Sequence, residues 1–372
     1  MSNKIDMLTL KLSRIFFNNE KTMFTICHDK GFIVFNTAPF AILNNRMLGG
    51  SVEIAQILEK SNILFLSSGP VEDRKYEPKN VIMFDDQKGK PIAQLKIGHN
   101  IKNIKVNSKR LFIVGRNKIF VFVTNNLSNV GTFDCYENDD EGICELAEEQ
   151  NEHVVFAYPN KYEGYVNVMI IKDKRTNIKS IHVSSKKISC LSLNKKGDRL
   201  LTTATTGNTI KLFNSITGDF LGCFKRGVEK AQIFSLNFSS DDSFISCSSD
   251  LGTIQIFKSS DIENTGIDLI NNEREKLGKN ILDKITDKKS APRIAKPKSK
   301  SNSQFGICKT NEVSNLCCFS PNDNIIMVSS TGCGKYYQFE FNQTKGGEIK
   351  FSQVIEILCK ENLSFLDGGK TP

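Results

Sequence analysis

Lys225 and Arg226 are the residues with the most distinctive chemistry in this sequence, and they stand next to each other directly before Gly227. On an extended strand, neighbouring side chains point to opposite sides, so each cation can serve a separate anion pocket. Hydroxyl groups and the backbone N–H groups of glycine-containing turns supply further donors to phosphate oxygens. Gly227 would let the backbone turn closely without a Cβ clash. The formal net charge of +9 favours anionic partners, namely nucleic acid, phosphoinositides or acidic protein surfaces.

Catalytic and metal-binding patterns are missing. The histidines lie in distant parts of the sequence, at His28, His99, His153 and His182. No GxSxG, HExxH or phosphate-loop motif is present. The 11 cysteines mostly lie inside apolar runs, without a CxxC pair or a zinc-ligand spacing. We therefore expect no enzyme activity, no cofactor and no metal, with buried free thiols in a reducing compartment.

The elements that would position the basic pair belong to a repeated pattern. One unit recurs along the 372 residues. It consists of an apolar strand, a turn rich in Gly, Asn, Asp or Lys, and a second strand that ends near a large apolar residue. The repeats close at Phe35, Phe84, Phe122, Ile171, Phe213, Phe257 and Phe339. The first six closures are roughly 38 to 49 residues apart, near the ~40–45 of WD-type propeller blades.

These strands alternate in hydrophobicity with period two, as half-buried antiparallel strands do. The fold class predicted is all-β, a seven-bladed β-propeller of WD-repeat type that forms a single domain over residues 1–372, with a long basic insert in the sixth blade. A tandem pair of β-sandwiches is the structural alternative. The sequence contains 26 Phe and no Trp, so Phe must fill the aromatic packing positions. Met1 to Phe16 lacks a signal-peptide pattern, and no window approaches the ~20 apolar residues of a membrane span, so membrane contact should be peripheral.

The insert, residues 258–304, interrupts the strand pattern. Its first part is predicted to be a modest amphipathic helix. The apolar positions expected on its membrane-inserting face are Ile267, Ile270, Leu277, Ile281 and Ile285. Lys284 to Lys300 then carries seven basic residues and one acidic residue, a net charge of +6. We expect a flexible, membrane-facing segment, although an ordinary solvated linker or a site for an acidic partner or nucleic acid fits the same composition.

Leu221 to Phe257, which contains the Phe224-Lys225-Arg226-Gly227 motif, resembles the PROPPIN family of phosphoinositide-binding propellers (WIPI-like proteins). The signature of that family is an aromatic residue or Leu followed by Arg-Arg-Gly, between the fifth and sixth blades. GFIVFNTAPF near the start, YEPKNVIMFDD, ISCLSLNKKGDRLLTTATTGNTIKLFN and SNLCCFSPNDN near the end are also similar to the family. The resemblance covers nearly the whole chain.

The resemblance implies two lipid headgroup sites on the propeller. The fifth-blade site would use Lys225, Lys211, Thr203, Thr205 and Lys186. The sixth-blade site would use Arg226, Lys230, Ser249 and Thr253, with Ser248 nearby and Gly227 in the motif. The alternative for any single hydroxyl is a strand-end residue that satisfies its own turn.

Three positions depart from the family pattern. Lys225 replaces the first Arg of the motif. This replacement keeps the positive charge but loses the pair of parallel N–H donors with which Arg binds a phosphate. Ser184 and Gln255 stand where the family pattern has His. We therefore rank the sixth-blade site as the stronger.

The function predicted is a peripheral membrane adaptor that binds phosphatidylinositol 3-phosphate and the 3,5-bisphosphate in autophagy-related or endosomal and vacuolar trafficking and recruits effector proteins. The protein would be cytoplasmic, monomeric in solution, and peripheral on autophagosomal, endosomal, vacuolar or other organelle membranes. We expect no nucleic acid partner. The alternative is a protein-interaction scaffold propeller without lipid specificity.

Two further surfaces could recruit proteins. Asp134 to Glu152 contains nine acidic residues and no basic ones. Lys102, Lys105, Lys109, Arg110 and Arg116 make the region between the second and third repeats basic. The resemblance suggests that this basic region is a groove for effectors, and ordinary solvated loops are the alternative for both surfaces.

Overall fold

A computed structural model of the chain describes residues 10–137, 142–148, 153–173, 175–262, 304–309, 315–321, 325–330, 334–344, 347–348 and 350–356. Nearly all regular structure in these residues is β-strand, with one 3-10 helix, η2 (Ser259–Asp261). Within the same residues, no helix is long and apolar enough to cross a membrane.

Seven sheets contain these strands. The first sheet is β1 (Leu12–Phe17), β2 (Met23–His28), β3 (Gly31–Thr37) and β4 (Phe40–Met47). The second is β5 (Ile54–Ile57), β6 (Ile63–Ser67), β7 (Asn80–Asp85) and β8 (Lys90–Lys96). The third is β9 (Asn103–Val106), β10 (Arg110–Val114), β11 (Lys118–Val123) and β12 (Asn129–Asp134). The fourth is β13 (Glu145–Leu146), β14 (Val154–Pro159), β15 (Tyr165–Lys172) and β16 (Arg175–His182).

The remaining sheets hold the motif and its surroundings. The fifth is β17 (Ile188–Leu193), β18 (Arg199–Ala204), β19 (Thr209–Asn214) and β20 (Phe220–Lys225). The sixth is β21 (Ile233–Phe238), β22 (Phe244–Ser249), β23 (Thr253–Lys258) and β24 (Gln304–Lys309), with β28 (Gly347–Glu348) parallel to β24 at its edge. The seventh is β25 (Asn315–Phe319), β26 (Ile325–Ser330), β27 (Lys335–Glu340) and β29 (Lys350–Glu356).

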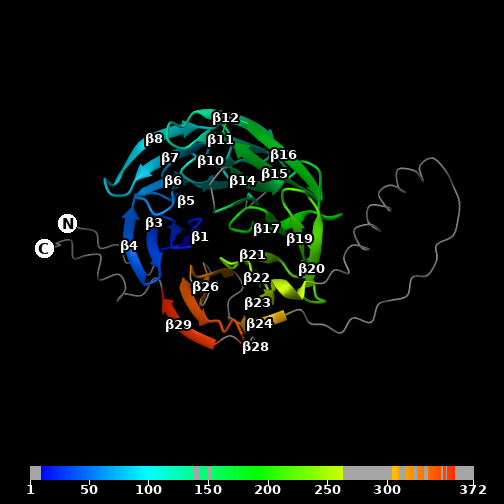
Figure 1. Cartoon of the computed structure of the whole chain (residues 1–372). Helices are drawn as coiled ribbons and strands as arrows, with labels where there is room; N and C mark the ends of the chain where they lie inside the picture. The colour runs from blue at the N-terminus through cyan, green and yellow to red at the C-terminus, as the bar shows by residue number, and fades with distance from the viewer. Residues whose placement is uncertain are drawn as a thin grey trace, which may run out of the picture.

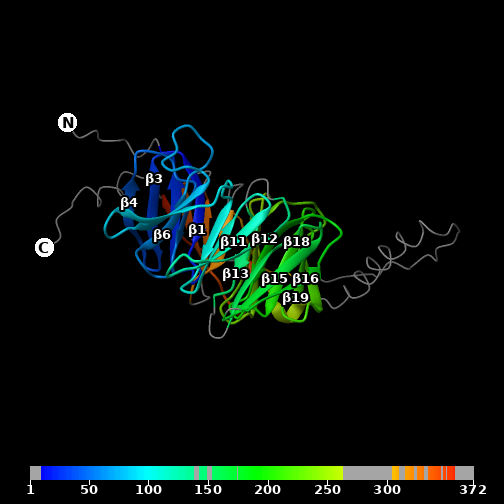
Figure 2. The same ribbon diagram turned by 90° about the horizontal axis from the view of Figure 1, so that it is seen from above.

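The sheets stand around a common centre (Figure 1). A cavity of about 360 Å³ at this centre is lined by residues of the first strand of every sheet, namely β1, β5, β9, β13, β17, β21 and β25. After a 90° turn, the strands are seen to cross the thickness of the ring (Figure 2). The prediction of an all-β propeller is therefore confirmed, and the β-sandwich alternative is wrong.

Each predicted repeat closes in the third strand of a different sheet. The closing residues Phe35, Phe84, Phe122, Ile171, Phe213, Phe257 and Phe339 lie in β3, β7, β11, β15, β19, β23 and β27. All seven are buried. The closing position is apolar because the third strand packs between neighbouring sheets, where burying a large side chain contributes about 1.5–3 kcal/mol.

Aromatic packing closes the ring between the last sheet and the first. Tyr336 of β27 stacks on Phe24 of β2 with ring centroids 5.4 Å apart, and it lies 4.9 Å from the ring of Phe40. Cys318 and Ile355 pack in the same cluster. The first and last sheets of this description share no strand, so side chains rather than ladder hydrogen bonds join them.

The insert joins two neighbouring strands of one sheet, because β23 ends at Lys258 and its antiparallel partner β24 begins at Gln304. Residues 263–303 lie outside the described residues. The predicted amphipathic positions Ile267, Ile270, Leu277, Ile281 and Ile285 fall in this segment, as does the basic run Lys284 to Lys300.

Candidate anion-binding sites

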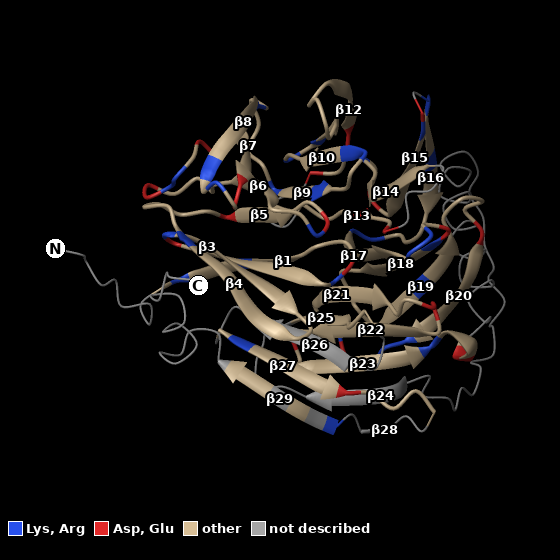
Figure 3. Cartoon of the chain, turned by 60° about the vertical axis from the view of Figure 1, so that its left-hand side comes forward, with Lys and Arg blue, Asp and Glu red and all other residues tan. Residues whose placement is uncertain are grey.

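The basic pair lies where β20 ends and the chain crosses to the sixth sheet. Lys225 is exposed and pairs with Thr209 of β19, whereas Arg226 is buried, with 6% of its surface exposed. Neighbouring positions of a strand face opposite sides, and the cations do so here. Figure 3 shows Lys and Arg positions near β18 and β19, in the same part of the molecule.

The guanidinium of Arg226 is held by backbone carbonyl groups. Its Nε donates to the carbonyl oxygen of Gly207 over 2.5 Å, and an Nη donates to the carbonyl oxygen of Glu229. In the described part of the chain, no carboxylate pairs with this group. Burial raises the pKa of the neighbouring Cys247 thiol well above its ordinary value, so the thiol is neutral and supplies no counter-charge. Among the described residues, the Arg226 guanidinium is therefore a buried cation with carbonyl partners and no carboxylate partner.

Hydroxyl and amide side chains of the sixth sheet border this cation. Ser249, Thr253 and Gln255 lie on the face of β22 and β23 that packs against the fifth sheet, together with Cys247. The Ser249 and Thr253 hydroxyls are 3.3 Å apart, and Nε2 of Gln255 donates to the carbonyl oxygen of Arg226 over 3.1 Å. The structure therefore brings together Arg226, Ser249 and Thr253 at one junction, with Lys230 exposed in the loop that follows the motif.

Ser248 does not belong to this group. Its hydroxyl lies 2.7 Å from that of Ser235, and Ser235 also contacts Cys317 of the seventh sheet. Ser248 therefore faces the opposite side of its strand from Ser249, and the structure does not bring its hydroxyl to the Arg226 junction.

Lys225 and Lys211 share the other face of the fifth sheet. Lys211 pairs with Cys223, two residues before Lys225, and with Thr202 on β18. Its Nζ donates to the carbonyl oxygen of Val183, in the connection from the fourth sheet, over 3.0 Å. Two ammonium groups thus share the side of the fifth sheet that packs against the fourth sheet.

Thr203 is expected beside these lysines from the sequence, whereas the structure places it on the other face of the fifth sheet. The residue is buried, and its hydroxyl lies 2.9 Å from that of Ser189. Its strand partner is Cys190, and Thr203 shares its face with Leu201, which packs toward the sixth sheet. Thr202 and Thr209 are the threonines on the lysine face.

The other expected members of the fifth-blade site lie in connecting segments. Thr205 is exposed and its backbone N–H donates to the carbonyl oxygen of Lys187 over 3.0 Å. Lys186 is also exposed, and its N–H donates to the Ser184 hydroxyl over 3.1 Å. Both residues lie at the same end of the fifth sheet as Lys225.

The expected reason for Gly227 is not found. A Cβ added there meets no atom within 4 Å, so space does not require glycine. Gly207 is the constrained position instead, because its φ is +62° and an added Cβ would lie 1.9 Å from the carbonyl oxygen of Ala231. Sequence analysis missed Gly207, although glycine in the TTGN turn before β19 is the signal that could have identified it.

The predicted effector groove is not a continuous basic surface. Lys105 is half-buried and forms a 2.9 Å ion pair with Glu145. Desolvation opposes the charged form, but the nearby Glu145 carboxylate outweighs it, so the pKa of Lys105 is raised. Arg116 pairs with Glu137, and Arg110 donates to the carbonyl oxygen of Asp173 over 2.8 Å. Glu145 and Glu148, from the acidic run, point inward as well, whereas residues 138–141 and 149–152 of that run lie outside the described residues.

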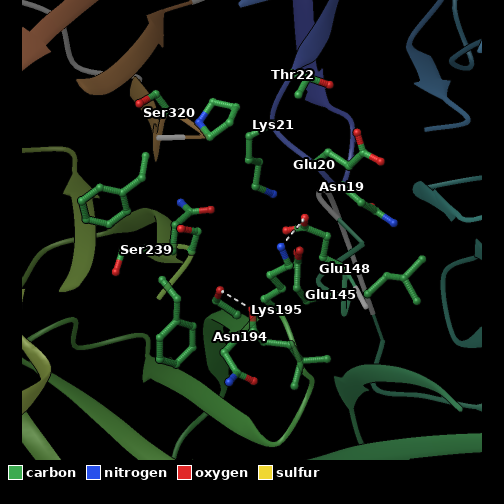
Figure 4. Close-up of a pocket in the computed structure, with 18 of the residues that line it drawn as sticks. Asn19, Glu20, Lys21, Thr22, Glu145, Glu148, Asn194, Lys195, Ser239 and Ser320 are labelled. Carbon is green, nitrogen blue, oxygen red and sulfur yellow. Dashed lines mark hydrogen bonds and ion pairs between the residues drawn. The ribbon is translucent and has the colours of Figure 1, made fainter. Parts of the chain in front are cut away.

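A second cavity, of about 330 Å³, opens where the first and second strands of several sheets turn. Lys21, Lys60 and Lys195 line it, and the last two pair with Glu20 at 3.3 Å and Glu148 at 3.6 Å. Figure 4 shows Lys21 and Lys195 together with Glu20, Glu145 and Glu148 around the opening. Because three lysines are matched by three glutamates in the lining, the charges of this cavity do not favour an anion.

Comparisons with known proteins place the chain in a family. The family model named PROPPIN matches residues 11–358. "Autophagy-related protein 18" of Dictyostelium discoideum is 25% identical over 358 residues, covering 93% of this chain and 94% of that protein. "SVP1-like protein 2" of Schizosaccharomyces pombe is 26% identical over 248 residues, covering 66% of this chain and 67% of that protein.

Solved structures show the same fold. A structure of Kluyveromyces lactis Hsv2 has a TM-score of 0.72 at 16% identity and covers 94% of this chain and 100% of that one. A structure titled "Complex of KlAtg21 with coiled-coil of AgAtg16" has a TM-score of 0.70 at 16% identity, covering 93% and 99%. The resemblance stated from the motif is therefore confirmed.

Proposed function

The chain belongs to the PROPPIN family, and from this premise we propose that it is a non-enzymatic peripheral membrane adaptor that binds phosphatidylinositol 3-phosphate and the 3,5-bisphosphate. It would act at autophagosomal, endosomal or vacuolar membranes facing the cytoplasm and recruit effector proteins there. We also propose that the seven sheets are seven blades of one domain, with residues 258–304 as a basic membrane-facing insert.

The observation that carries the proposal is the buried guanidinium of Arg226, which has carbonyl partners and, among the described residues, no carboxylate partner. A buried cation is costly unless an anion compensates it. A phosphate group supplies both the charge and acceptor oxygens for a planar guanidinium. The hydroxyls of Ser249 and Thr253 and the exposed Lys230 would add donors.

The second headgroup would bind on the other side of the fifth sheet, between Lys225 and Lys211, with Lys186 and Thr205 at the same end. Lys225 is a point charge that lacks the bidentate geometry of Arg, so we rank this site as the weaker one. Single exposed charges are screened over about 8–10 Å in a salty cytoplasm. Two headgroup sites on one sheet make the second contact intramolecular, which can raise avidity by ~10²–10⁴.

Co-flotation with liposomes tests the proposal. Wild type should float with vesicles that contain either phosphoinositide and stay behind with vesicles that lack both. Lys225→Ala/Arg226→Ala should abolish flotation. Lys195→Ala/Lys196→Ala is the matched control, because it removes the same charge from the opposite end of the fifth sheet, in the β17–β18 turn, and should float normally.

Three outcomes would count against the proposal. Equal flotation of wild type and the motif variant would assign binding to the bulk charge of the insert. Equal loss in both double variants would indicate a general charge effect. Absence of flotation in every case would favour a protein-interaction scaffold without lipid specificity.

A further inference from the structure

Val228 is the most exposed large apolar residue of the described chain, with 98% of its surface accessible. It stands in the loop between β20 and β21, two residues after Arg226. Its neighbours Gly227, Glu229 and Lys230 are also exposed. Transfer of this side chain from water into an apolar environment would be favourable.

The loop is fixed in this shape by hydrogen bonds. Nδ2 of Asn208 donates to the carbonyl oxygens of Gly227, Val228 and Glu229 at 3.3, 2.6 and 2.9 Å. The Arg226 guanidinium donates to the carbonyl oxygen of Glu229 from the other side. The backbone below Val228 is therefore tied to the β18–β19 turn, and the side chain has no way to fold back.

A second apolar tip lies in the adjoining turn. The backbone N–H of Gln232 donates to the Asp250 carboxylate over 3.1 Å, and the N–H of Asp250 donates to the Gln232 carbonyl oxygen over 3.0 Å. These bonds join the Val228 loop to the β22–β23 turn, where Leu251 is 47% exposed. Val228 and Leu251 thus project from one end of the fifth and sixth sheets.

The charges around this end favour an anionic surface. Lys225 and Lys230 flank Val228 in sequence, and both are exposed. Glu229 and Asp250 are the acidic residues of the same two segments, and Asp250 is engaged by Gln232. Apolar tips with basic side chains beside them are found in proteins that insert into the interface of an anionic bilayer.

We propose that Val228, with Leu251 beside it, enters the headgroup and acyl boundary of the membrane while a headgroup occupies the Arg226 site. This inference rests on the proposed function and adds a specific contact from the folded body of the protein. Because the loop is already ordered by Asn208, insertion requires no rearrangement.

The absence of Trp from the sequence makes a direct test simple. Val228→Trp introduces a single indole, whose emission should shift to shorter wavelength and be quenched by brominated acyl chains when phosphatidylinositol 3-phosphate vesicles are added. Ile216→Trp is the control, because Ile216 is 40% exposed in the β19–β20 turn at the opposite end of the same sheet. Its emission should not change. Equal behaviour of the two variants would overturn the proposal.

Val228→Asn tests the energetic contribution without adding charge beside Arg226. It should weaken vesicle binding about tenfold, as expected when a buried Val contact is lost, and leave binding of soluble inositol 1,3-bisphosphate unchanged. Ile216→Asn should change neither. If Val228→Asn binds vesicles as wild type does, the insertion is wrong even though headgroup binding stands. If wild type does not bind the soluble headgroup at all, the proposed function itself fails.

Discussion

At the scale of residues, the difference between Lys225 and Arg226 decides how the two candidate sites should behave. Arg226 is buried between the fifth and sixth sheets and is oriented by the carbonyl oxygens of Gly207 and Glu229. Lys225 is exposed at the other face of the fifth sheet. The Arg226 guanidinium is planar and already oriented. It should therefore lose less conformational entropy on binding a phosphate than the ammonium of an exposed lysine does.

Reciprocal substitutions test this difference. Arg226→Lys keeps the charge and cannot reproduce two oriented donors, so binding of soluble inositol 1,3-bisphosphate should weaken about tenfold, a loss of about 1.4 kcal/mol. Lys225→Arg should strengthen the weaker site several-fold. Isothermal titration calorimetry measures both. A tighter Arg226→Lys variant would contradict the assigned role of the guanidinium.

His28 makes the stability of the protein depend on pH. The ring is fully buried in β2, and its Nδ1 accepts the backbone N–H of Lys30 over 3.1 Å. Burial lowers the pKa of His28 to about 4, with Asp29 opposing the shift. Because the unfolded chain binds the proton more tightly, with a pKa near 6.5, this contribution is complete above about pH 6.5 and is lost as the pH falls toward 4.

Urea unfolding at pH 7 and pH 5 measures this contribution. Between these values the wild-type free energy of unfolding should fall about 2 kcal/mol further than that of His28→Gln, which has no titrating ring. An equal fall in both proteins would show that His28 does not carry the effect.

At the scale of elements, the turns between second and third strands position the site. The β18–β19 turn brings the Gly207 carbonyl oxygen to Arg226 and the Asn208 side chain to the next loop. Gly207 needs its positive φ and the absence of a Cβ because the Ala231 carbonyl oxygen lies against it. The geometry of the β18–β19 turn therefore helps to set the position of the Arg226 guanidinium.

Gly207→Ala should cost about 1–3 kcal/mol of unfolding free energy and weaken headgroup binding at the Arg226 site. Gly31→Ala is the matched control, because an added Cβ there also lies 1.9 Å from a carbonyl oxygen, that of Arg46, in the first sheet. It should reduce stability similarly and leave headgroup affinity unchanged. Thermal unfolding and calorimetry on both variants separate the two effects. Normal headgroup affinity in Gly207→Ala would contradict the proposed dependence of the Arg226 site on the β18–β19 turn.

The same elements show what sequence could predict. Period-two alternation identified the strands, and each closing residue lies in a third strand. The faces of individual hydroxyls were predicted less well. Thr203 lies one residue after Thr202, which pairs with Lys211, and Ser248 lies one residue before Ser249. Because successive residues of a strand face opposite sides, an offset of one residue in the expected position moves a hydroxyl to the other face of the sheet.

Lys105 shows a second limit of sequence-based prediction. Charge clustering placed it on a surface groove, whereas the fold pairs it with Glu145, 40 residues away, inside the ring. Such a contact depends on which first strands become neighbours around the axis. The Lys225–Arg226 pair was predicted better because its division between two faces follows from strand geometry alone.

At the scale of the whole molecule, the ring is closed by packing between the seventh and first sheets. Tyr336 lies between Phe24 and Phe40 and is completely buried. Tyr336→Ala should lower the free energy of unfolding by about 3–5 kcal/mol, whereas Tyr336→Phe retains the ring contacts and should cost far less. Chemical denaturation compares the two. Similar costs would show that the hydroxyl, rather than the aromatic packing, closes the ring.

The central claim is that two anion sites lie on opposite faces of the fifth sheet, and the stoichiometry of soluble inositol 1,3-bisphosphate tests it most directly. Calorimetry on wild type, Lys225→Ala and Arg226→Ala counts the sites. The account predicts two sites in wild type and one in each variant, with the tighter site lost in Arg226→Ala. A single site in wild type, or two sites in either variant, would contradict it.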